Sequence, residues 1–345
     1  MSGLPSDQPL QTQTLTATAA PDMATAVALL RAGRLVAVPT ETVYGLAADA
    51  RQATAVAGIF RAKQRPDSHP LIVHIADASA LPDWARDIPD SARQLAAAFW
   101  PGPLTLLLHK AAAVPAVVTG GLPAIGLRVP AHPVLLQVLR QLDTGLAAPS
   151  ANLHKQLSPT SAAQVLAGLE GRIDAVLDGG ICPVGLESTI VDLTQDTPRI
   201  LRAGPITRTQ LETVLGTAVA SPEQHEVSVP GNVAEHYRPR TPLYRGDATR
   251  LERALQAAPA SLRLGLVTHG QSTWPKTAAN LQQLVLPTEP ADYASRLYYS
   301  LFTLDNAQLD AILLESPPAT EAWAAINDRL RRAAMDQQPP WLRTE

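Results

Sequence analysis

The chain has 345 residues, of which 46% are hydrophobic, so it is long enough for two domains with substantial cores. Its formal net charge of -3 excludes the overall positive field by which a dedicated RNA-binding domain holds a polyanion. The single cysteine, Cys182, excludes an internal disulfide framework and a multi-cysteine zinc finger.

Residues 1–20 are rich in Thr, Gln and Ala, and they contain no Lys or Arg and no apolar stretch. This composition predicts a disordered tail, not a secretory signal or a mitochondrial presequence. No apolar run approaches the ~18–20 residues that a bilayer span needs. A lone cysteine suits a reducing compartment. We therefore expect a cytoplasmic protein with no membrane partner.

The first periodic segment predicts a helix over 23–32, which ends at Gly33. A strand over 35–38 follows, and the polar residues 40–42 lie at its carboxyl end, where open α/β sheets usually place ligand groups. Helical patterns separate several of the later strands, and this alternation predicts an α/β fold. The later strands are expected at 71–75, 104–109, 125–129, 146–148, 175–177 and 189–193.

A helix is expected over 208–215, and the proline-rich segment 217–242 behind it predicts a semi-rigid linker. The α/β pattern then restarts, with helices at 249–257, 291–304 and 322–334 and strands at 263–267, 283–286 and 311–314. The predicted organisation is a tail at 1–20, a catalytic domain at 21–216, the linker at 217–242 and a smaller α/β domain at 243–345.

Two polar clusters lie in the first third of the chain. Residues 39–46 form a strand-to-loop turn, which either satisfies its own hydroxyl groups or presents them to a ligand. Arg61, Lys63 and Arg65 precede Pro66, and their charges either grip phosphates or complement a solvated helix end. His69 and His74 flank the next strand, and a lone histidine is more often structural than functional.

Two further clusters follow later strands. Arg128 ends one strand, and the small polar residues 150–152 follow another, where backbone N–H groups approach phosphates easily. Ser158 either caps the next helix or contacts a ligand. The glycine-rich stretch from Asp178 leads to Ser188, and Arg202 follows the next strand, although such glycine motifs are weak evidence alone.

The ordered combination of motifs is far more specific than any one of them. The motifs are PTETVYGL from Pro39, KxR from Lys63, PLIVHI from Pro70, FWPGPLTLLL from Phe99, GLRVP from Gly126, APSAN from Ala148, CPVGLESTIVDL from Cys182 and ILRAG from Ile200. Together they resemble the YrdC-like threonylcarbamoyl-AMP synthase family from about residue 20 to 207. Residues 230–239 and 325–330 are similar to the linker and the last helix of its two-domain branch.

The resemblance implies a twisted mixed-sheet domain with a deep concave site and a smaller Rossmann-like α/β C-terminal domain. Matching the motifs transfers the family's threonine contacts to Thr42, His74, Arg128 and Ser188, with the Ala148 backbone nearby. Its ATP contacts fall on Lys63, Arg65, His69, Ser150, Asn152, Ser158, Arg202 and Tyr237, and Lys63 and Arg65 are the predicted catalytic residues. His69 replaces a more usual Asn, and Glu235 a more usual basic residue.

The implied reaction converts L-threonine, bicarbonate or CO2, and ATP into threonylcarbamoyl-AMP and pyrophosphate, for N6-threonylcarbamoyladenosine formation in tRNA. Such an enzyme is a nucleotidyltransferase, with Mg²⁺ bound through the phosphates and no protein metal site. No nucleophile and base set is evident, so positioning and charge stabilisation are the expected means of catalysis. tRNA and a tRNA threonylcarbamoyl-transferase complex are the expected partners.

Three rival functions are weighed against the synthase. A structural or regulatory paralogue with a dead site is opposed by the joint presence of Lys63, Arg65, Ser150, Asn152, Ser188 and Arg202. An RNA-binding YrdC-like module without synthase activity is opposed by the net charge and by an aromatic content of 4%. A hydrogenase-maturation carbamoyltransferase embeds a similar domain but carries zinc fingers, which one cysteine cannot build. For residues 230–242, we expect a lid that places Tyr237 over ATP, and a plain extended spacer is the alternative.

Overall fold

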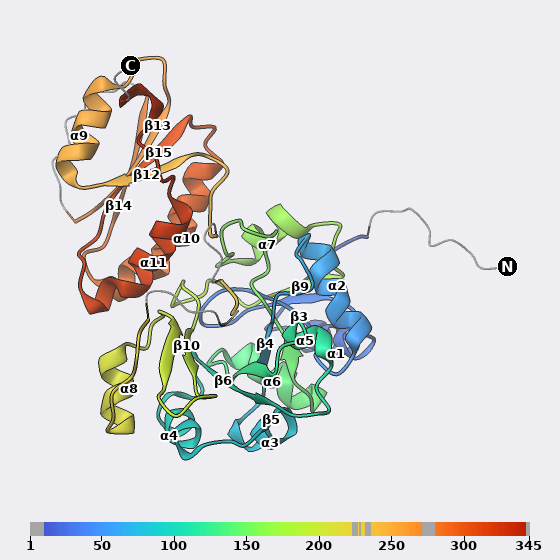
Figure 1. The fold of residues 1–345 in the computed structure, drawn as a ribbon. Coiled ribbons are helices and arrows are strands. Elements are labelled where there is room, and N and C mark those ends of the chain that lie inside the picture. The colour runs from blue at the N-terminus through green and yellow to red at the C-terminus, as the bar shows by residue number, and fades with distance from the viewer. Residues whose placement is uncertain (1–9, 223–226, 228, 232–235, 271–279, 343–345) are drawn as a thin grey trace.

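The computed structural model describes residues 10–222, 227, 229–231, 236–270 and 280–342, which form two α/β domains joined by a linker (Figure 1). The helices of the first domain are α1 (Ala20–Arg31), α2 (Ala53–Lys63), α3 (Leu81–Trp84), α4 (Asp90–Phe99), α5 (Ala116–Thr119), α6 (Pro133–Leu142), α7 (Ala162–Leu169) and α8 (Arg208–Leu215). Its strands are β1 (Gln13–Thr16), β2 (Val36–Val38), β3 (Gly45–Asp49), β4 (Ile72–His74), β5 (Ala85–Arg86), β6 (Leu104–Lys110), β7 (Ala124–Arg128), β8 (Leu146–Ala147), β9 (Ala175–Asp178), β10 (Thr189–Asp192) and β11 (Arg199–Arg202).

The strands of the first domain form one mixed sheet, in the order β1-β9-β2-β3-β8-β4-β7-β6-β10-β11, with β5 beside β6. Parallel pairs join β4 to β7 and β6 to β10, whereas β7 and β6 run antiparallel. The predicted mixed sheet is therefore confirmed. In parallel neighbours the carboxyl ends meet at one edge, so the register His74↔Arg128 brings two predicted site residues together.

The expectation of a disordered tail through residue 20 was wrong for its second half. Residues 13–16 form β1, which pairs in parallel with β9, and Leu15 is buried against α1. The strand lacks a clear alternation of buried and exposed side chains, because one side chain of the four is buried and the other three are exposed. Pairing with β9 supplies the order that local composition does not. Residues 1–9 of the predicted tail lie outside the described residues.

The second domain is a four-stranded parallel sheet in the order β12-β15-β13-β14, which confirms the predicted Rossmann-like fold. Its strands are β12 (Leu243–Gly246), β13 (Leu264–His269), β14 (Leu281–Leu286) and β15 (Ala311–Glu315), and its helices are α9 (Ala248–Ala257), α10 (Pro290–Asp305) and α11 (Ala324–Ala333). Helices α10 and α11 lie between this sheet and the first domain, whereas α9 covers the opposite face (Figure 1). No helix among the described residues is both long and apolar enough to cross a bilayer.

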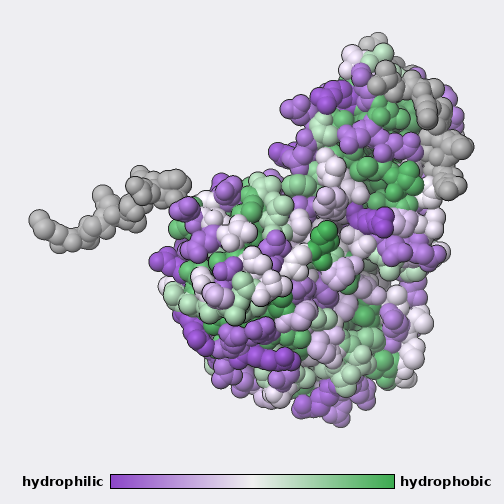
Figure 2. Space-filling model, turned by 180° about the vertical axis from the view of Figure 1, so that it is seen from behind, coloured by the Kyte–Doolittle hydropathy of each residue, from purple (hydrophilic) through white to green (hydrophobic). Residues whose placement is uncertain are grey.

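The two domains share an apolar cluster. Val43, Leu157 and Leu186 of the first domain belong to the same buried group as Leu297 and Ile326 of α10 and α11. Seen from behind, the second domain stands on one side of the larger domain in continuous contact with it (Figure 2). The start of the predicted linker at 217–242 still pairs with the first domain, because residue 220 forms a parallel β-bridge with residue 199.

One glycine allows close backbone packing between the domains. Gly185 has a φ of +77°, and a Cβ built there would lie 2.5 Å from the backbone oxygen of Ala294 in α10. A side chain at this position would therefore push the loop before β10 away from α10.

Candidate active site

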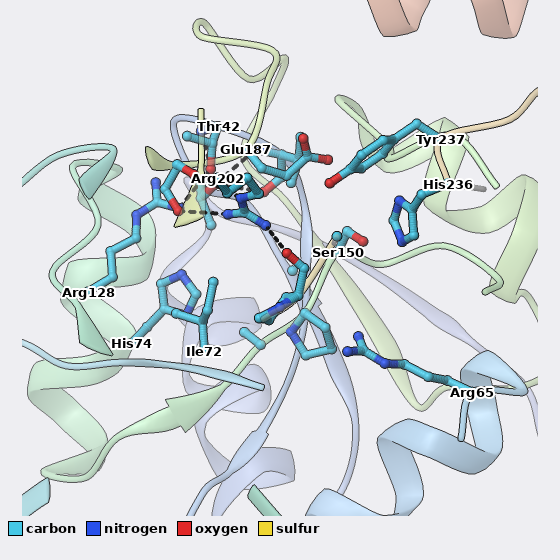
Figure 3. Close-up of a pocket in the computed structure, with 18 residues that line it drawn as sticks. Thr42, Arg65, Ile72, His74, Arg128, Ser150, Glu187, Arg202, His236 and Tyr237 are labelled. Carbon is cyan, nitrogen blue, oxygen red and sulfur yellow. Dashed lines mark hydrogen bonds between the residues drawn. The ribbon is translucent and has the colours of Figure 1, made fainter. Parts of the chain in front are cut away.

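A cavity lies beyond the carboxyl ends of β4 and β7, and the linker contributes part of its lining (Figure 3). Nine of the residues predicted from the sequence line it: Thr42, Arg65, His74, Arg128, Ala148, Ser150, Ser188, Arg202 and Tyr237. These residues come from separate strand ends, loops and the linker. They are spread over almost two hundred positions of the sequence, and the fold brings them together.

Arg128 and Glu41 form a buried ion pair at one end of the cavity. The guanidinium Nη2 lies 2.6 Å from Glu41 Oε1, and the two side chains are only 4% and 8% exposed. Arg128 Nη1 donates to Thr42 Oγ1 at 2.9 Å, and its Nε donates to the Gly102 carbonyl at 3.2 Å. Sequence reasoning assigned no role to Glu41, although the strand end that placed Thr42 near a ligand applies to it equally.

The turn after β2 is held by its own hydroxyl groups, as one of the two interpretations of this motif expected. Thr40 Oγ1 accepts from the N–H groups of Thr42 and Val43 and lies 2.8 Å from Thr42 Oγ1. Thr42 nevertheless faces the cavity and meets Arg128. The hydroxyl pair thus closes the turn and leaves Thr42 facing the cavity, whereas its contact with a ligand stays a prediction.

His74 lies beside Arg128 with both ring nitrogens buried and without a close hydrogen-bond partner among the described residues. Burial, with the nearby Arg128 charge, lowers the pKa of His74 to about 3, so the ring is neutral at physiological pH. Apart from a backbone contact with Leu146, this buried ring in the cavity wall keeps hydrogen-bonding capacity for a ligand.

Ser188 and Arg202 also line the cavity and are bound to each other. Arg202 donates from Nε to the Ser188 carbonyl and from Nη2 to Ser188 Oγ, both at 3.0 Å. Ser188 Oγ also lies 2.8 Å from Thr105 Oγ1, a buried hydroxyl in β6 that the sequence did not point to. Arg202 lies in β11 and not after a strand, and its Nη1 reaches the linker at the Pro230 carbonyl.

Lys63 and Arg65 point in different directions although one residue separates them. Gln64 is left-handed at φ 53° and ends α2, and the Arg65 N–H turns back to the Phe60 carbonyl at 2.9 Å. Arg65 lines the cavity, and burial lowers its pKa to about 10, which leaves it charged at neutral pH. Lys63 Nζ donates to the backbone carbonyls of Ser150 and Asn152, each at 2.5 Å.

Four predicted residues lie behind or beside the lining. Lys63 supports the loop that carries Ser150, and Asn152 donates to the carbonyls of Leu153 and Gln156 in the same loop. Ser158 donates to Glu187 Oε1 at 2.5 Å and does not cap α7, which Ser161 caps instead. His69 is half-buried, and its ring centroid lies 5.6 Å from that of His154.

A row of histidines runs from His69 toward the linker. The ring centroid of His154 lies 6.3 Å from that of His236, and His236 lies 4.0 Å from the Tyr237 ring. Burial and the Arg65 charge lower the pKa of His154 to about 4, and burial with nearby cations holds the pKa of His236 well below its ordinary value. His154 was missed because no motif covers it.

The linker residues Pro230, Gly231, His236 and Tyr237 all line the cavity. Tyr237 is 1% exposed, and its hydroxyl has no hydrogen-bond partner among the described residues. A Cβ built on Gly231 would lie 2.2 Å from that hydroxyl, so only glycine fits there. Glu235, the predicted departure from the family pattern, lies outside the described residues.

The chain matches two family models along most of its length. Residues 28–204 match the Sua5/YciO/YrdC model, described as telomere recombination, and residues 206–335 match the threonylcarbamoyl-AMP synthase C-terminal domain. The threonylcarbamoyl-AMP synthase of Bacillus subtilis is 39% identical over 322 residues, which cover 91% of this chain and 93% of the relative. That of Pyrococcus abyssi is 36% identical over 321 residues, which cover 90% and 93%.

Solved structures agree with the sequence comparison. The crystal structure of P. abyssi Sua5 complexed with L-threonine superposes with a TM-score of 0.84 and 34% identity, and the match covers 94% of this chain and 97% of that one. A variant of the same protein, in which an adjacent histidine and tyrosine are both alanine, gives a TM-score of 0.85 at 33% identity. These matches favour an enzyme over a bare RNA-binding module, and the chain belongs to the two-domain Sua5 family of threonylcarbamoyl-AMP synthases.

Proposed function

We propose that the chain is a nucleotidyltransferase that makes threonylcarbamoyl-AMP and pyrophosphate from L-threonine, bicarbonate or CO2, and ATP. The observation that carries the proposal is the cavity, whose lining brings the buried Arg128 and the neutral His74 together with two further arginines, Arg65 and Arg202. Sequence identity of 39% and 36% with two threonylcarbamoyl-AMP synthases, over alignments that cover about nine-tenths of the chain, supports the proposal.

Threonine would bind at the end formed by Arg128, His74, Thr42 and Ser188, with the Ala148 backbone beside it. Arg128 presents its guanidinium fork to the threonine carboxylate. His74 is neutral and has spare hydrogen-bonding capacity, so it can bond to the substrate without repelling the amine. Hydroxyl groups at Thr42 and Ser188 suit the threonine hydroxyl, and a site built around a hydroxyl rejects analogues that lack it.

ATP would bind at the other end, where Arg65, Ser150, Arg202 and Tyr237 line the cavity. Arg65 is the cation best placed to meet the phosphates. Lys63, whose pKa burial holds well below its ordinary value, supports the 150–152 loop. Asn152 orders the same loop, and Ser158 is bound to Glu187. His69 lies at the outer end of the histidine row, beside Arg65.

The chemistry needs no covalent enzyme intermediate. The threonine amine first becomes a carbamate, either by adding to CO2 with loss of a proton or by condensing with bicarbonate with loss of water. A carbamate oxygen then attacks the α-phosphorus of ATP. A new P–O bond forms as the bond to pyrophosphate breaks, and pyrophosphate leaves with the electron pair. Arg65 and Arg202 would offset the charge on the phosphates, and fixing both substrates in line can contribute roughly 7–11 kcal/mol.

The residues at the cavity fit a magnesium ion carried on the phosphates of ATP, not one caged by protein. Glu41 and Glu187 are engaged by Arg128 and Arg329. No cluster of three or more metal-ligating side chains occurs in the described part of the chain. When bound, the ion would offset phosphate charge.

The linker would act as a lid over the nucleotide. Four of its residues line the cavity, and Arg202 donates to the Pro230 carbonyl at 2.9 Å, which ties the linker to the nucleotide end. Such a cover would shield the carbamate and the adenylate from water. A cytoplasmic transferase would then move the threonylcarbamoyl group to an adenosine of tRNA.

Mass detection of threonylcarbamoyl-AMP tests the proposal directly. The purified chain is incubated with threonine, ATP, bicarbonate and Mg²⁺, and each component is omitted in turn. The adduct should form only in the complete mixture, with one pyrophosphate released per adduct. Pyrophosphate release that does not require threonine, or no adduct in the complete mixture, would overturn it.

A further inference from the structure

We infer that Arg329, in the last helix of the second domain, is a positioning residue for the active site and acts through Glu187 and Tyr237. This inference rests on the proposed function. Glu187 and Tyr237 lie along one rim of the cavity (Figure 3), whereas Arg329 itself does not line it. The second domain therefore supports the cavity wall from behind without touching the substrates.

Glu187 is held by groups from three separate segments. Arg329 Nε donates to its Oε2 at 2.8 Å, and Tyr298 of α10 donates to the same oxygen at 3.2 Å. Ser158 donates to Oε1 at 2.5 Å. Both carboxylate oxygens are thus occupied, and two of the three donors belong to the second domain.

The electrostatics make Arg329 the decisive partner. Its side chain is 1% exposed, and that of Glu187 is 8% exposed. Burial alone would raise the pKa of Glu187, but Arg329, followed by Arg202, holds that pKa below its ordinary value. The titratable and charged groups that face this carboxylate are Arg329 of α11, Tyr298 of α10, Arg202 of β11 and Tyr237 of the linker. Asp328 of α11 faces the Arg329 guanidinium instead.

Arg329 also reaches the linker side of the cavity. Its guanidinium carbon lies 5.1 Å from the centre of the Tyr237 ring, in a cation–π contact. Asp328 balances the same guanidinium at 2.9 Å. One side chain thus touches residues at two points of the rim.

The route to the reacting groups is short. Glu187 directly precedes Ser188, which receives two hydrogen bonds from Arg202. If Glu187 loses its cation, the buried carboxylate must protonate or move, and Ser188 moves with it. A displacement of about 1 Å in a positioning group can cost on the order of 100-fold in rate.

The experiment compares Arg329→Gln with Arg331→Gln in the full-length chain. Arg331 lies on the same helix and also pairs with Asp328, but it is 60% exposed and far less constrained. Threonylcarbamoyl-AMP synthesis is measured with threonine and ATP varied separately, below the Tm of each variant. Arg329→Gln should lose at least 10-fold in kcat/KM, Arg329→Lys should recover part of this loss, and Arg331→Gln should stay within twofold of wild type.

A pH profile separates positioning from simple loss of stability. Without Arg329 the pKa of Glu187 rises, because its strongest opposition to desolvation is gone and only Arg202 and Ser158 still oppose it. An acid limb in the rate should therefore move toward neutral pH. In the double variant Glu187→Gln/Arg329→Gln this limb should disappear, because no carboxyl group is left to titrate. Wild-type kinetics and an unchanged profile in Arg329→Gln would overturn the inference.

Two milder variants keep the test decisive if Arg329→Gln does not fold. Tyr298→Phe removes one hydrogen bond to Glu187, and Arg329→Lys keeps the charge, and both should lower kcat/KM by at least twofold. Wild-type values in both would refute the inference. The failure of the proposed function looks different, because the wild-type chain itself would then make no threonylcarbamoyl-AMP.

Discussion

Replacing Arg128 tests the threonine end of the cavity most sharply, and the structure decides which substitution to use. Arg128→Leu leaves Glu41 buried without its cation, and breaking a buried pair in this way costs about 3–5 kcal/mol of stability. Its kinetic effect would then be mixed with misfolding. Arg128→Lys keeps a positive charge near Glu41 but loses the planar fork, so it tests the contact with the carboxylate at a smaller cost in stability.

The expected size follows from the hydrogen bonds that the fork makes. A charge-assisted hydrogen bond contributes about 1.5–3 kcal/mol, so losing one to the threonine carboxylate should raise the KM for threonine about 10- to 160-fold. The KM for ATP should change by less than about twofold. Initial rates of pyrophosphate release give both constants, and Arg140→Lys, at an exposed position of α6, is the matched control.

Two results would refute this reasoning. An unchanged KM for threonine in a folded Arg128→Lys would remove the guanidinium from the carboxylate site. Equal increases for both substrates would mean that Arg128 supports the cavity as a whole through Glu41 and Thr42.

Three further changes probe the other walls. Arg65→Ala should lower turnover about 10- to 160-fold through the loss of one charge-assisted phosphate contact. Arg61→Ala, at an exposed position of α2, is the control and should not lower turnover. Equal rates in both variants would exclude Arg65 from the site. Tyr237→Ala should raise the KM for ATP, and Tyr237→Phe separates the hydroxyl contact from the ring; wild-type kinetics in both would leave the linker a spacer. Between pH 6.5 and about 3, His74 takes up a proton in the unfolded chain but stays neutral in the folded one. The free energy of unfolding of the wild type should therefore fall as the pH drops, by up to about 1.4 kcal/mol per pH unit more than that of His74→Asn. Urea titrations at several pH values measure this difference. Parallel slopes would contradict the low pKa.

The cavity lining was predictable where the signal was local. Thr42, His74 and Arg128 each lie at or just beyond a strand end, and strand ends can be found from apolar runs followed by polar residues. Motif matching added Ser188 and Tyr237, for which spacing and composition alone gave no role. Strand β3 was missed because its Gly-Leu-Ala-Ala-Asp sequence has weak β propensity, and pairing with β2 and β8 decides its structure.

What could not be predicted depends on contacts between distant segments. Nothing in the local sequence predicts the ion pair between Glu41 and Arg128. The same is true of the contact between Thr105 and Ser188 and of the ion pair between Glu187 and Arg329. The different positions of Lys63 and Arg65 were also not predictable. The left-handed residue Gln64 turns Arg65 into the cavity, whereas Lys63 Nζ lies behind the loop that carries Ser150. Such outcomes follow from tertiary packing, which a single sequence read residue by residue does not contain.

The separation of 142 residues between Glu187 and Arg329 also has a consequence during synthesis. A ribosome adding about 5–20 residues per second needs roughly 7–28 s to cover that distance, while the first domain already has its own sheet and can begin to fold. During this interval the Glu187 carboxylate lacks the Arg329 guanidinium that pairs with it in the finished chain. The rim of the cavity takes its final form only when α11 has left the ribosome, so a chain cut short within the second domain would carry the substrate-facing residues and still lack a finished site.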